Sequence, residues 1–201
     1  MYWSLGYLLG IGGATIASID EGKKLNNKKR IFTTCLALGI IISIFLTVIQ
    51  NLYLDEFLKF LGISQETFLI AKQYLRIVSM ATGIYIIPFI LCAFIKNDNN
   101  PNLFMIGMIV CNITNLALDY IFIFIFKLGM IGAAISTVSS QVFLILVLCI
   151  HFLRKNRKIG LQHLDIRFED IKRIIIVGMP SFMNEITGGI IVFIFNIDFI
   201  S

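Results

Sequence analysis

One carboxylate lies in the middle of an apolar run. Asp119 stands within "NITNLALDYIFIF", residues 112–124, among isoleucine, leucine and phenylalanine. Asn112, Asn115 and Asp119 are spaced i, i+3, i+7, which places them on one stripe of an α-helix. A carboxylate in hydrocarbon is costly, so its presence there indicates a functional role. Such an acid can bind and release a proton as water access changes, or hold a sodium ion or an organic cation when ionised.

Other polar residues in the apolar runs are candidates for the same site. Asn115 lies one helical turn before Asp119, and its amide can donate to the carboxylate or coordinate a cation through oxygen. Thr137 and Gln141, spaced i, i+4 in the next apolar run, can face this stripe. Interhelical hydrogen bonding without a transport role, worth about 0.6–2 kcal/mol per contact, is the competing interpretation for Asn112, Thr137 and Gln141.

Glu185 is the second carboxylate well inside an apolar run. It follows Pro180 by five residues in "GMPSFMNEITGG". A proline frees a backbone carbonyl and bends the helix, and Gly188–Gly189 permits close packing or flexing. A carboxylate beside such a bend suits a moving helix that lines a substrate cavity. A helix-end acid that reaches for the membrane interface is the alternative.

The elements that hold these residues belong to an all-α integral membrane protein. Of the 201 residues, 58% are hydrophobic and only 14% are charged, whereas soluble domains carry about 25% charged residues. The net charge of +5 does not indicate a nucleic-acid partner, because the basic residues lie between the apolar runs. The four cysteines lack metal-ligand spacing and are interpreted as packing residues. His151 and His163 are isolated, so no metal site or cofactor is expected.

Six membrane spans are predicted, each except the first with the about 20 residues that crossing a bilayer requires. Pro88 predicts a kink in the third. The loops after the first and fifth spans are rich in Lys and Arg, so the positive-inside rule places the loops after the first, third and fifth spans in the cytoplasm. The segment "HLDIRFEDIKR" is either an amphipathic stretch on the membrane surface or a linker. The spans are residues 2–18, 31–53, 72–95, 102–126, 129–153 and 173–197.

Four stretches resemble the MATE family (multidrug and toxic compound extrusion), most of all its bacterial, MepA-like branch. They are "GIGGATIASIDEGKK", "FLGISQETFLIAKQYLRI", "NLALDYIFIFIFKLGMIGAAISTVSSQ" and "GMPSF", and they follow the family's order and spacing over nearly the whole chain. The resemblance implies a twelve-helix transporter of the bacterial plasma membrane, with two six-helix lobes around a cavity open to alternate sides. Such transporters expel cationic amphipathic compounds in exchange for protons or sodium ions.

The resemblance also implies roles for particular residues. Asn115, Asp119 and Thr137 match the Asn, Asp and Thr that form a cation site in prokaryotic relatives. Glu185 matches the seventh-helix glutamate of other branches only loosely, since that acid commonly lies about one turn further from the proline. Asp119 is therefore the expected coupling carboxylate, and Glu185, Asn112 and Gln141 are expected to line the cavity.

The six spans correspond to the second through seventh helices of the family. Residues 1–160 would form five spans of an incomplete N-terminal lobe, and residues 161–201 the inter-lobe loop and the first span of the second lobe. The family's first helix and most of its second lobe have no counterpart here. The resemblance thus implies a fragment or a truncated reading frame, for which the remainder of the transporter is the missing partner.

Multidrug efflux by proton or sodium antiport is the predicted function, without enzymatic chemistry. A membrane fragment that is inactive or only binds a partner is one alternative. A flippase of lipid-linked oligosaccharides is another, although it usually brings more basic residues into the membrane cavity, where Arg76 is the single candidate. An intramembrane aspartyl protease would need paired-Asp motifs that are missing from this sequence.

Overall fold

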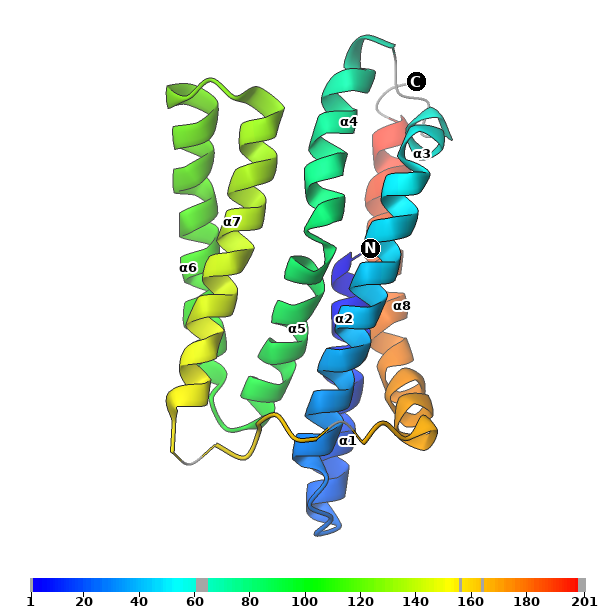
Figure 1. Ribbon diagram of the computed structural model, residues 1–201, viewed down its shortest axis with the longest axis vertical. Coiled ribbons are helices and arrows are strands. Elements are labelled where there is room, and N and C mark those ends of the chain that lie inside the picture. The colour runs from blue at the N-terminus through cyan, green and yellow to red at the C-terminus, as the bar shows by residue number, and fades with distance from the viewer. Residues whose placement is uncertain (1, 61–64, 156, 164, 199–201) are drawn as a thin grey trace.

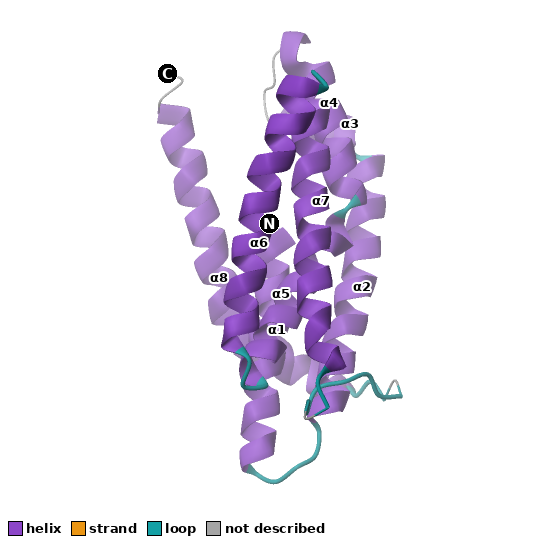
Figure 2. Ribbon diagram, turned by 90° about the vertical axis from the view of Figure 1, so that its left-hand side faces the viewer, coloured by secondary structure: helices purple, strands orange, loops and turns teal. Residues whose placement is uncertain are grey.

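The computed structural model is a bundle of long helices (Figure 1), and the structure describes residues 2–60, 65–155, 157–163 and 165–198. Within these residues the chain forms helices and loops, with no strand (Figure 2). The elements are α1 (Tyr2–Gly22), α2 (Lys28–Leu52), α3 (Leu54–Phe60), α4 (Gln65–Met80), α5 (Thr82–Asn97), α6 (Pro101–Asp119), the π-helix η1 (Tyr120–Ile125), α7 (Gly129–Cys149), the 3-10 helix η2 (Ile150–Leu153) and α8 (Phe168–Asp198).

Four helical stretches are long and apolar enough to cross a membrane, and a bent pair adds a fifth. The four are α2, α6 with η1, α7 with η2, and α8 as far as Ile191, and the bent pair is α4 with α5. The remaining predicted span, α1, is helical over 21 residues but is not among these candidate spans. The structure confirms the all-helical membrane architecture.

The connections alternate between two ends of the bundle. The α1–α2, α5–α6 and α7–α8 connections lie at one end, and the α6–α7 turn lies at the other (Figure 1). The loops that the charge pattern assigns to one side therefore share one end of the molecule. We call it the basic end, defined by residues 23–30, 98–100, 154–155, 157–163 and 165–167.

Helix α1 is the centre of the packing and contacts α8, α5 and α2. Glycines allow these contacts to be close. A Cβ atom at Gly178 would collide with the carbonyl oxygen of Leu8, and one at Gly10 would lie 2.8 Å from the carbonyl oxygen of Phe89. Any side chain at these positions would force backbone apart, so the glycines of α1 and α8 determine how closely α5 and α8 approach α1.

The third predicted span is bent, but not at Pro88. The break lies at Ala81, where α4 and α5 meet at 47°, and Pro88 is buried inside the continuous helix α5. The carbonyl oxygen of Ser79 accepts hydrogen bonds from the hydroxyls of Thr82 (2.6 Å) and Thr47 (3.0 Å). Hydroxyl donors next to a break satisfy backbone groups that the helix leaves unpaired, which stabilises the bend here.

Ion pairs connect α8 to the first helices at the basic end. Arg173 contacts Asp20 of α1 at 2.8 Å, and Arg30 of α2 contacts Asp170 at 3.2 Å. The described part of the preceding segment is a loop, and α8 begins at Phe168. The described residues of this segment before 168 do not form a helix, and Ile171 belongs to the first turns of α8. Leu164 lies outside the described residues.

Candidate functional site

Asp119 lies at the point where α6 gives way to the π-helix η1. It is half-buried and faces α7, where the hydroxyl of Ser136 donates a hydrogen bond to its Oδ1. π-Helical turns are rare and occur frequently at functional sites. Figure 2 shows the α6–α7 hairpin from its outer side.

Gly132 lets the two arms of this hairpin meet. A Cβ atom at this position would lie 3.0 Å from the backbone carbonyl group of Phe122 in η1. With glycine there, α7 approaches η1 closely, and one turn further on Ser136 comes within hydrogen-bonding reach of Asp119. Small residues at a helix crossing thereby position a polar contact between two membrane helices.

The structure places the other predicted residues nearby, without a hydrogen bond to Asp119 among the described contacts. Thr137 donates to the carbonyl oxygen of Ala133 within its own helix at 2.7 Å. Asn115 is half-buried and Asn112 is exposed. Within the described contacts, the acid is therefore held by Ser136.

Gln141 lies in the same hairpin, on α7, five residues after Ser136. Its Nε2 lies 3.6 Å from the Sγ of Cys111 on α6, and its buried Oε1 has no hydrogen-bond partner among the described residues. An unpaired buried oxygen is unusual and is able to accept a bond from a ligand.

Ser136 is the site residue that the sequence reasoning missed. It belongs to a stripe of small residues at positions 129, 132, 133, 136 and 140, and such a stripe in a membrane helix indicates close helix packing. The stripe does pack against α6 and η1, and for that reason its hydroxyl groups face the helix that carries Asp119. A search of the packing stripe for hydrogen-bonding side chains would have found Ser136.

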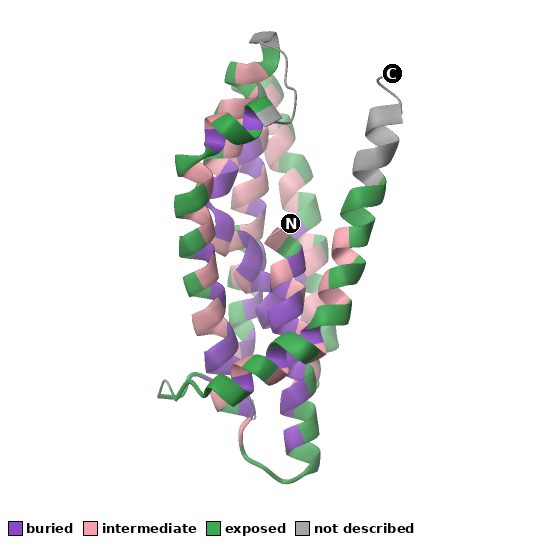
Figure 3. Ribbon diagram, turned by 90° about the vertical axis from the view of Figure 1, so that its right-hand side faces the viewer, coloured by how far each residue is buried: buried purple, intermediate pink, exposed green. Residues whose placement is uncertain are grey.

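Glu185 lies in a different part of the molecule. Figure 1 shows α8 and the α6–α7 hairpin at opposite edges of the bundle. Toward its C-terminal end α8 leans away from the other helices and is largely exposed (Figure 3). Between α8 and the start of α1 is a cavity of about 600 Å³, lined by Trp3, Ser4, Asn184, Glu185, Thr187, Gly188, Gly189 and Ile191.

The Glu185 cavity combines an indole ring with a carboxylate. Trp3 is half-exposed, and an indole face attracts a cation that comes within about 6 Å of it. Volumes of about 300–1,000 Å³ are typical of sites for drug-sized molecules. The cavity therefore has the size and chemistry for an organic cation.

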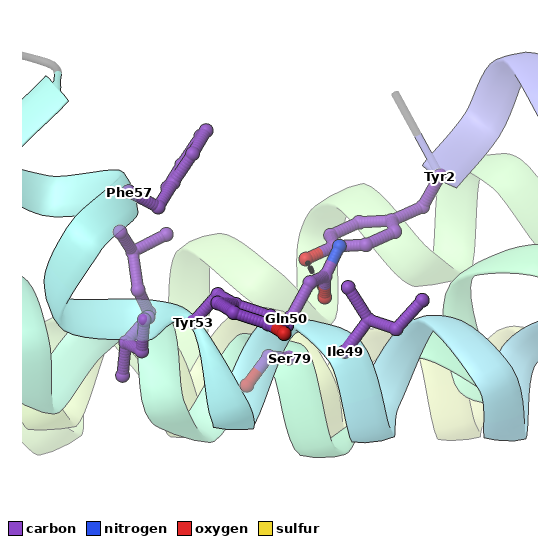
Figure 4. A pocket seen from close by; sticks show the side chains of 8 residues that line it. Tyr2, Ile49, Gln50, Tyr53, Phe57 and Ser79 are labelled. Atoms are coloured by element: carbon purple, nitrogen blue, oxygen red, sulfur yellow. Dashed lines mark hydrogen bonds between the residues drawn. The ribbon is translucent and has the colours of Figure 1, made fainter.

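A second cavity, of about 310 Å³, was not predicted from the sequence. It lies among the ends of α2, α3 and α4 and the start of α1, and the hydroxyl of Tyr2 donates to Oε1 of Gln50 at 2.8 Å (Figure 4). Its wall is mainly apolar and aromatic. The lining residues are Tyr2, Ile49, Gln50, Tyr53, Leu54, Phe57, Leu75 and Ser79.

The cysteines and histidines make no metal cluster among the described residues. Cys35, Cys92 and Cys111 are buried free thiols, as expected of packing residues, whereas Cys149 at the end of α7 is exposed. His151 is not isolated in space, because its Nε2 lies 2.9 Å from Oδ2 of Asp98. That contact joins residues more than fifty positions apart, so no local pattern reveals it.

Comparison with known families and structures gives one consistent result. A model of the MatE family matches residues 1–121. The multidrug export protein MepA of Staphylococcus saprophyticus is 32% identical over 197 residues, which are 96% of this chain and 44% of that protein. The chain therefore spans less than half the length of this curated relative.

Two solved structures share the fold. An inward-facing multidrug resistance MATE family transporter superposes with a TM-score of 0.85 at 22% identity, covering 90% of this chain and 42% of its own. An outward-facing structure of a multidrug resistance MATE family transporter superposes with a TM-score of 0.84 at 21% identity, covering 96% of this chain and 44% of its own. The two TM-scores are nearly equal, so this part of the fold is common to the inward-facing and the outward-facing structure.

Proposed function

The chain belongs to the MatE family, and we propose that it acts in multidrug export driven by exchange for protons or sodium ions. Asp119 is the coupling carboxylate in this proposal. The observation that carries it is the bonding of Asp119: a membrane carboxylate held by the hydroxyl of Ser136, with no cationic side chain within ion-pair distance among the described residues. Its remaining oxygen capacity is free for a proton or a cation.

In this proposal, residues near Asp119 would supply further oxygen ligands. Asn115 lies one turn away on α6, and the Thr137 hydroxyl is next to Ser136 on α7. Sodium binding would draw on these oxygens together with the carboxylate, whereas a proton needs the carboxylate alone. The arrangement serves either ion.

The proposed substrates are cationic amphipathic molecules, and the Glu185 cavity is their proposed binding region. Its carboxylate would balance the positive charge, and Trp3 would contact the apolar or aromatic part. Binding of the driving ion at Asp119 would favour the conformation that releases the drug, because a ligand shifts a two-state equilibrium by its difference in affinity for the two states. Export would take place across a bacterial plasma membrane.

The test is ethidium efflux from a drug-sensitive bacterial strain without exporters of its own. We expect Asp119→Asn to reduce ion-driven efflux to background while membrane insertion is unchanged. Asp55→Asn is the matched control, because Asp55 is half-exposed and paired with Lys72 at 2.7 Å outside the hairpin. Imposed proton and sodium gradients, applied separately, identify the driving ion.

Undiminished efflux by Asp119→Asn would overturn the role of Asp119. No efflux by the unchanged 201-residue chain would overturn export by this chain alone and favour a partner-dependent role.

A further inference from the structure

A small hollow of about 130 Å³ lies at the basic end of the bundle, away from Asp119 and Glu185. It is formed by the α5–α6 loop and by the segment that follows η2. It is smaller than the about 300–1,000 Å³ of sites for drug-sized molecules. Its lining residues are Asp98, Asn99, His151, Arg154, Arg157 and Lys158.

The floor of the hollow is rigid. His151 is fully buried, and its Nδ1 lies 3.2 Å from the amide nitrogen of Asn100. An amide nitrogen only donates, so Nδ1 accepts and the ring proton is on Nε2, which donates to Asp98 Oδ2 at 2.9 Å. Both ring nitrogens are therefore occupied within the protein.

The negative charge of Asp98 is already balanced. Its carboxylate receives Lys28 Nζ at 3.2 Å and the backbone N–H of Lys158 at 3.0 Å, in addition to His151. Burial raises the pKa of Asp98, but the hydrogen bonds from His151 and Lys158 and the charge of Lys28 outweigh it and hold this pKa below its usual value. Asp98 thus organises the hollow without repelling an anion at its mouth.

The mouth of the hollow is positively charged. The guanidinium of Arg157 lies 5.8 Å from the ring centroid of Phe152. Lys158 Nζ forms an ion pair with Glu21 at 2.6 Å. Arg154 and Arg157 are exposed, and neither has a carboxylate partner among the described ion pairs. Guanidinium groups bind phosphate oxygens in a two-pronged geometry, which favours a phosphate ligand here.

The surroundings place this mouth at the membrane interface. Arg154 directly follows Leu153, the last residue of a stretch long and apolar enough to cross a membrane. The Leu153 side chain is 81% exposed, and that of Leu161 on the same segment is 75% exposed. Ile159 between them is fully buried and anchors the segment. Apolar side chains in lipid and arginines directly beside them match the depth of phospholipid headgroups.

We propose that Arg154 and Arg157 form a binding site for the phosphate of an anionic phospholipid in the cytoplasmic leaflet. The hollow has room for a phosphate group, and the exposed leucines beside it face the acyl chains. Basic pockets between membrane helices on the cytoplasmic side bind such headgroups, with about 1 kcal/mol for each Lys or Arg near the surface. Two arginines therefore correspond to at least a tenfold gain in affinity.

The test is a lipid titration of the purified protein in detergent, followed by its thermal unfolding midpoint. We expect phosphatidylglycerol to raise the midpoint and phosphatidylcholine to leave it nearly unchanged. The double variant Arg154→Gln, Arg157→Gln should weaken the apparent affinity for phosphatidylglycerol at least tenfold. The double variant to lysine should lie between the two, because it keeps the charge and loses the planar fork.

Lys23→Gln with Lys29→Gln is the matched control. It removes the same charge from exposed positions in the α1–α2 connection and the first turn of α2, and we expect the affinity to stay within about twofold, since these lysines do not line the hollow. Equal weakening in the control and the arginine variant would overturn the site in favour of general charge attraction. Unchanged affinity in the arginine variant would overturn it as well.

Inorganic phosphate and glycerol 3-phosphate distinguish the source of the phosphate. Neither should raise the midpoint at the concentration at which phosphatidylglycerol is effective, because they lack acyl chains. An arginine-dependent rise with inorganic phosphate at that concentration would overturn the lipid assignment and identify a site for a soluble phosphate.

Discussion

Two carboxylates in this molecule have opposite surroundings. Asp98, at the basic end, has a side chain that is 4% exposed and is bonded to Lys28, His151 and the backbone of Lys158. Asp119, in the α6–α7 hairpin, is half-buried and has Ser136 as its partner among the described contacts. Both acids lie in or beside apolar helices. The difference teaches that a carboxylate with its oxygens fully used supports the fold, whereas one with free capacity is available to bind.

The neighbouring elements explain this difference. Asp98 lies in the α5–α6 loop, where α2 brings Lys28, η2 brings His151 and the segment after η2 brings the backbone N–H of Lys158. Asp119 faces a single helix, and its own helix is thinly covered: the buried residues of α6 are Gly107 and Cys111, and η1 has none. A hairpin with so few buried contacts offers few polar partners.

Neutralising each acid in turn tests the comparison and should give the largest effect. We expect Asp98→Asn to lower the free energy of unfolding by about 3–5 kcal/mol, because it removes the buried carboxylate that pairs with Lys28 at 3.2 Å and leaves this buried lysine, among the described ion pairs, with the more exposed Glu21 at 3.4 Å. Asp119→Asn should change it by less than about 1 kcal/mol, because the amide keeps an oxygen that accepts from Ser136. Denaturant unfolding in micelles, followed by circular dichroism, measures both.

Asp165→Asn is the control for charge loss at the basic end. Asp165 is 56% exposed and contacts Arg167 at 3.1 Å, and exposed pairs of this kind contribute about 0–1 kcal/mol. Similar losses for the Asp98 and Asp119 variants would show that the two acids do not differ in structural role.

The dependence of stability on acid pH should show a smaller effect of Asp98 than its substitution does. The folded-state pKa of Asp98 is lowered, so its stabilisation is complete above its unfolded value of about 3.9 and is lost as the pH falls through the folded value. The same sign holds for Asp20, whose pKa is lowered chiefly by the hydrogen bond from Arg173.

We therefore expect a thermal midpoint that is nearly constant above about pH 5 and falls below about pH 4. The Asp98→Asn variant should start lower and show a shallower fall, because one of the titrating groups is gone. Parallel curves for the two proteins would mean that Asp98 does not contribute to the acid transition.

Removal of Ser136, the partner of Asp119 among the described contacts, should give the smallest effect, seen in transport rather than stability. A hydrogen bond to a charged group contributes about 1.5–3 kcal/mol, so Ser136→Ala should slow ion-driven ethidium efflux by at least about tenfold. Ser136→Thr should retain efflux because it keeps the hydroxyl. Ser140→Ala is the control, since Ser140 is also buried on α7 and donates to the Thr137 carbonyl. Equal rates in Ser136→Ala and Ser140→Ala would remove Ser136 from the site.

The local features of the chain were accessible from the sequence because they depend on runs of residues. Apolar runs of about 20 residues predict membrane helices, and five of the six expected spans meet that requirement in the structure once α4 and α5 count as one. The alternation of basic loops predicted which connections share an end. The spacing of Asn115 and Asp119 placed them on α6 without any knowledge of the neighbouring helices.

The bend of the third span shows where local reasoning stops. Pro88 is a helix-disrupting residue in sequence terms, yet the break lies at Ala81, where hydroxyls from α2 and α5 satisfy the carbonyl of Ser79. One of those donors, Thr47, comes from another helix. The site of the bend therefore depends on a tertiary contact.

The sequence by itself determined that Asp119 is a carboxylate inside a membrane helix, and only the tertiary structure decided that Ser136 contacts it. Successive residues of an α-helix point about 100° apart, so the rotation of α7 decides whether the hydroxyl of Ser136 or that of Thr137 contacts Asp119 directly. The approach of Gly132 to Phe122 sets the rotation of α7, and this rotation selects Ser136. The contact between Asp98 and His151 has the same origin, because helix packing rather than residue spacing brings the two together.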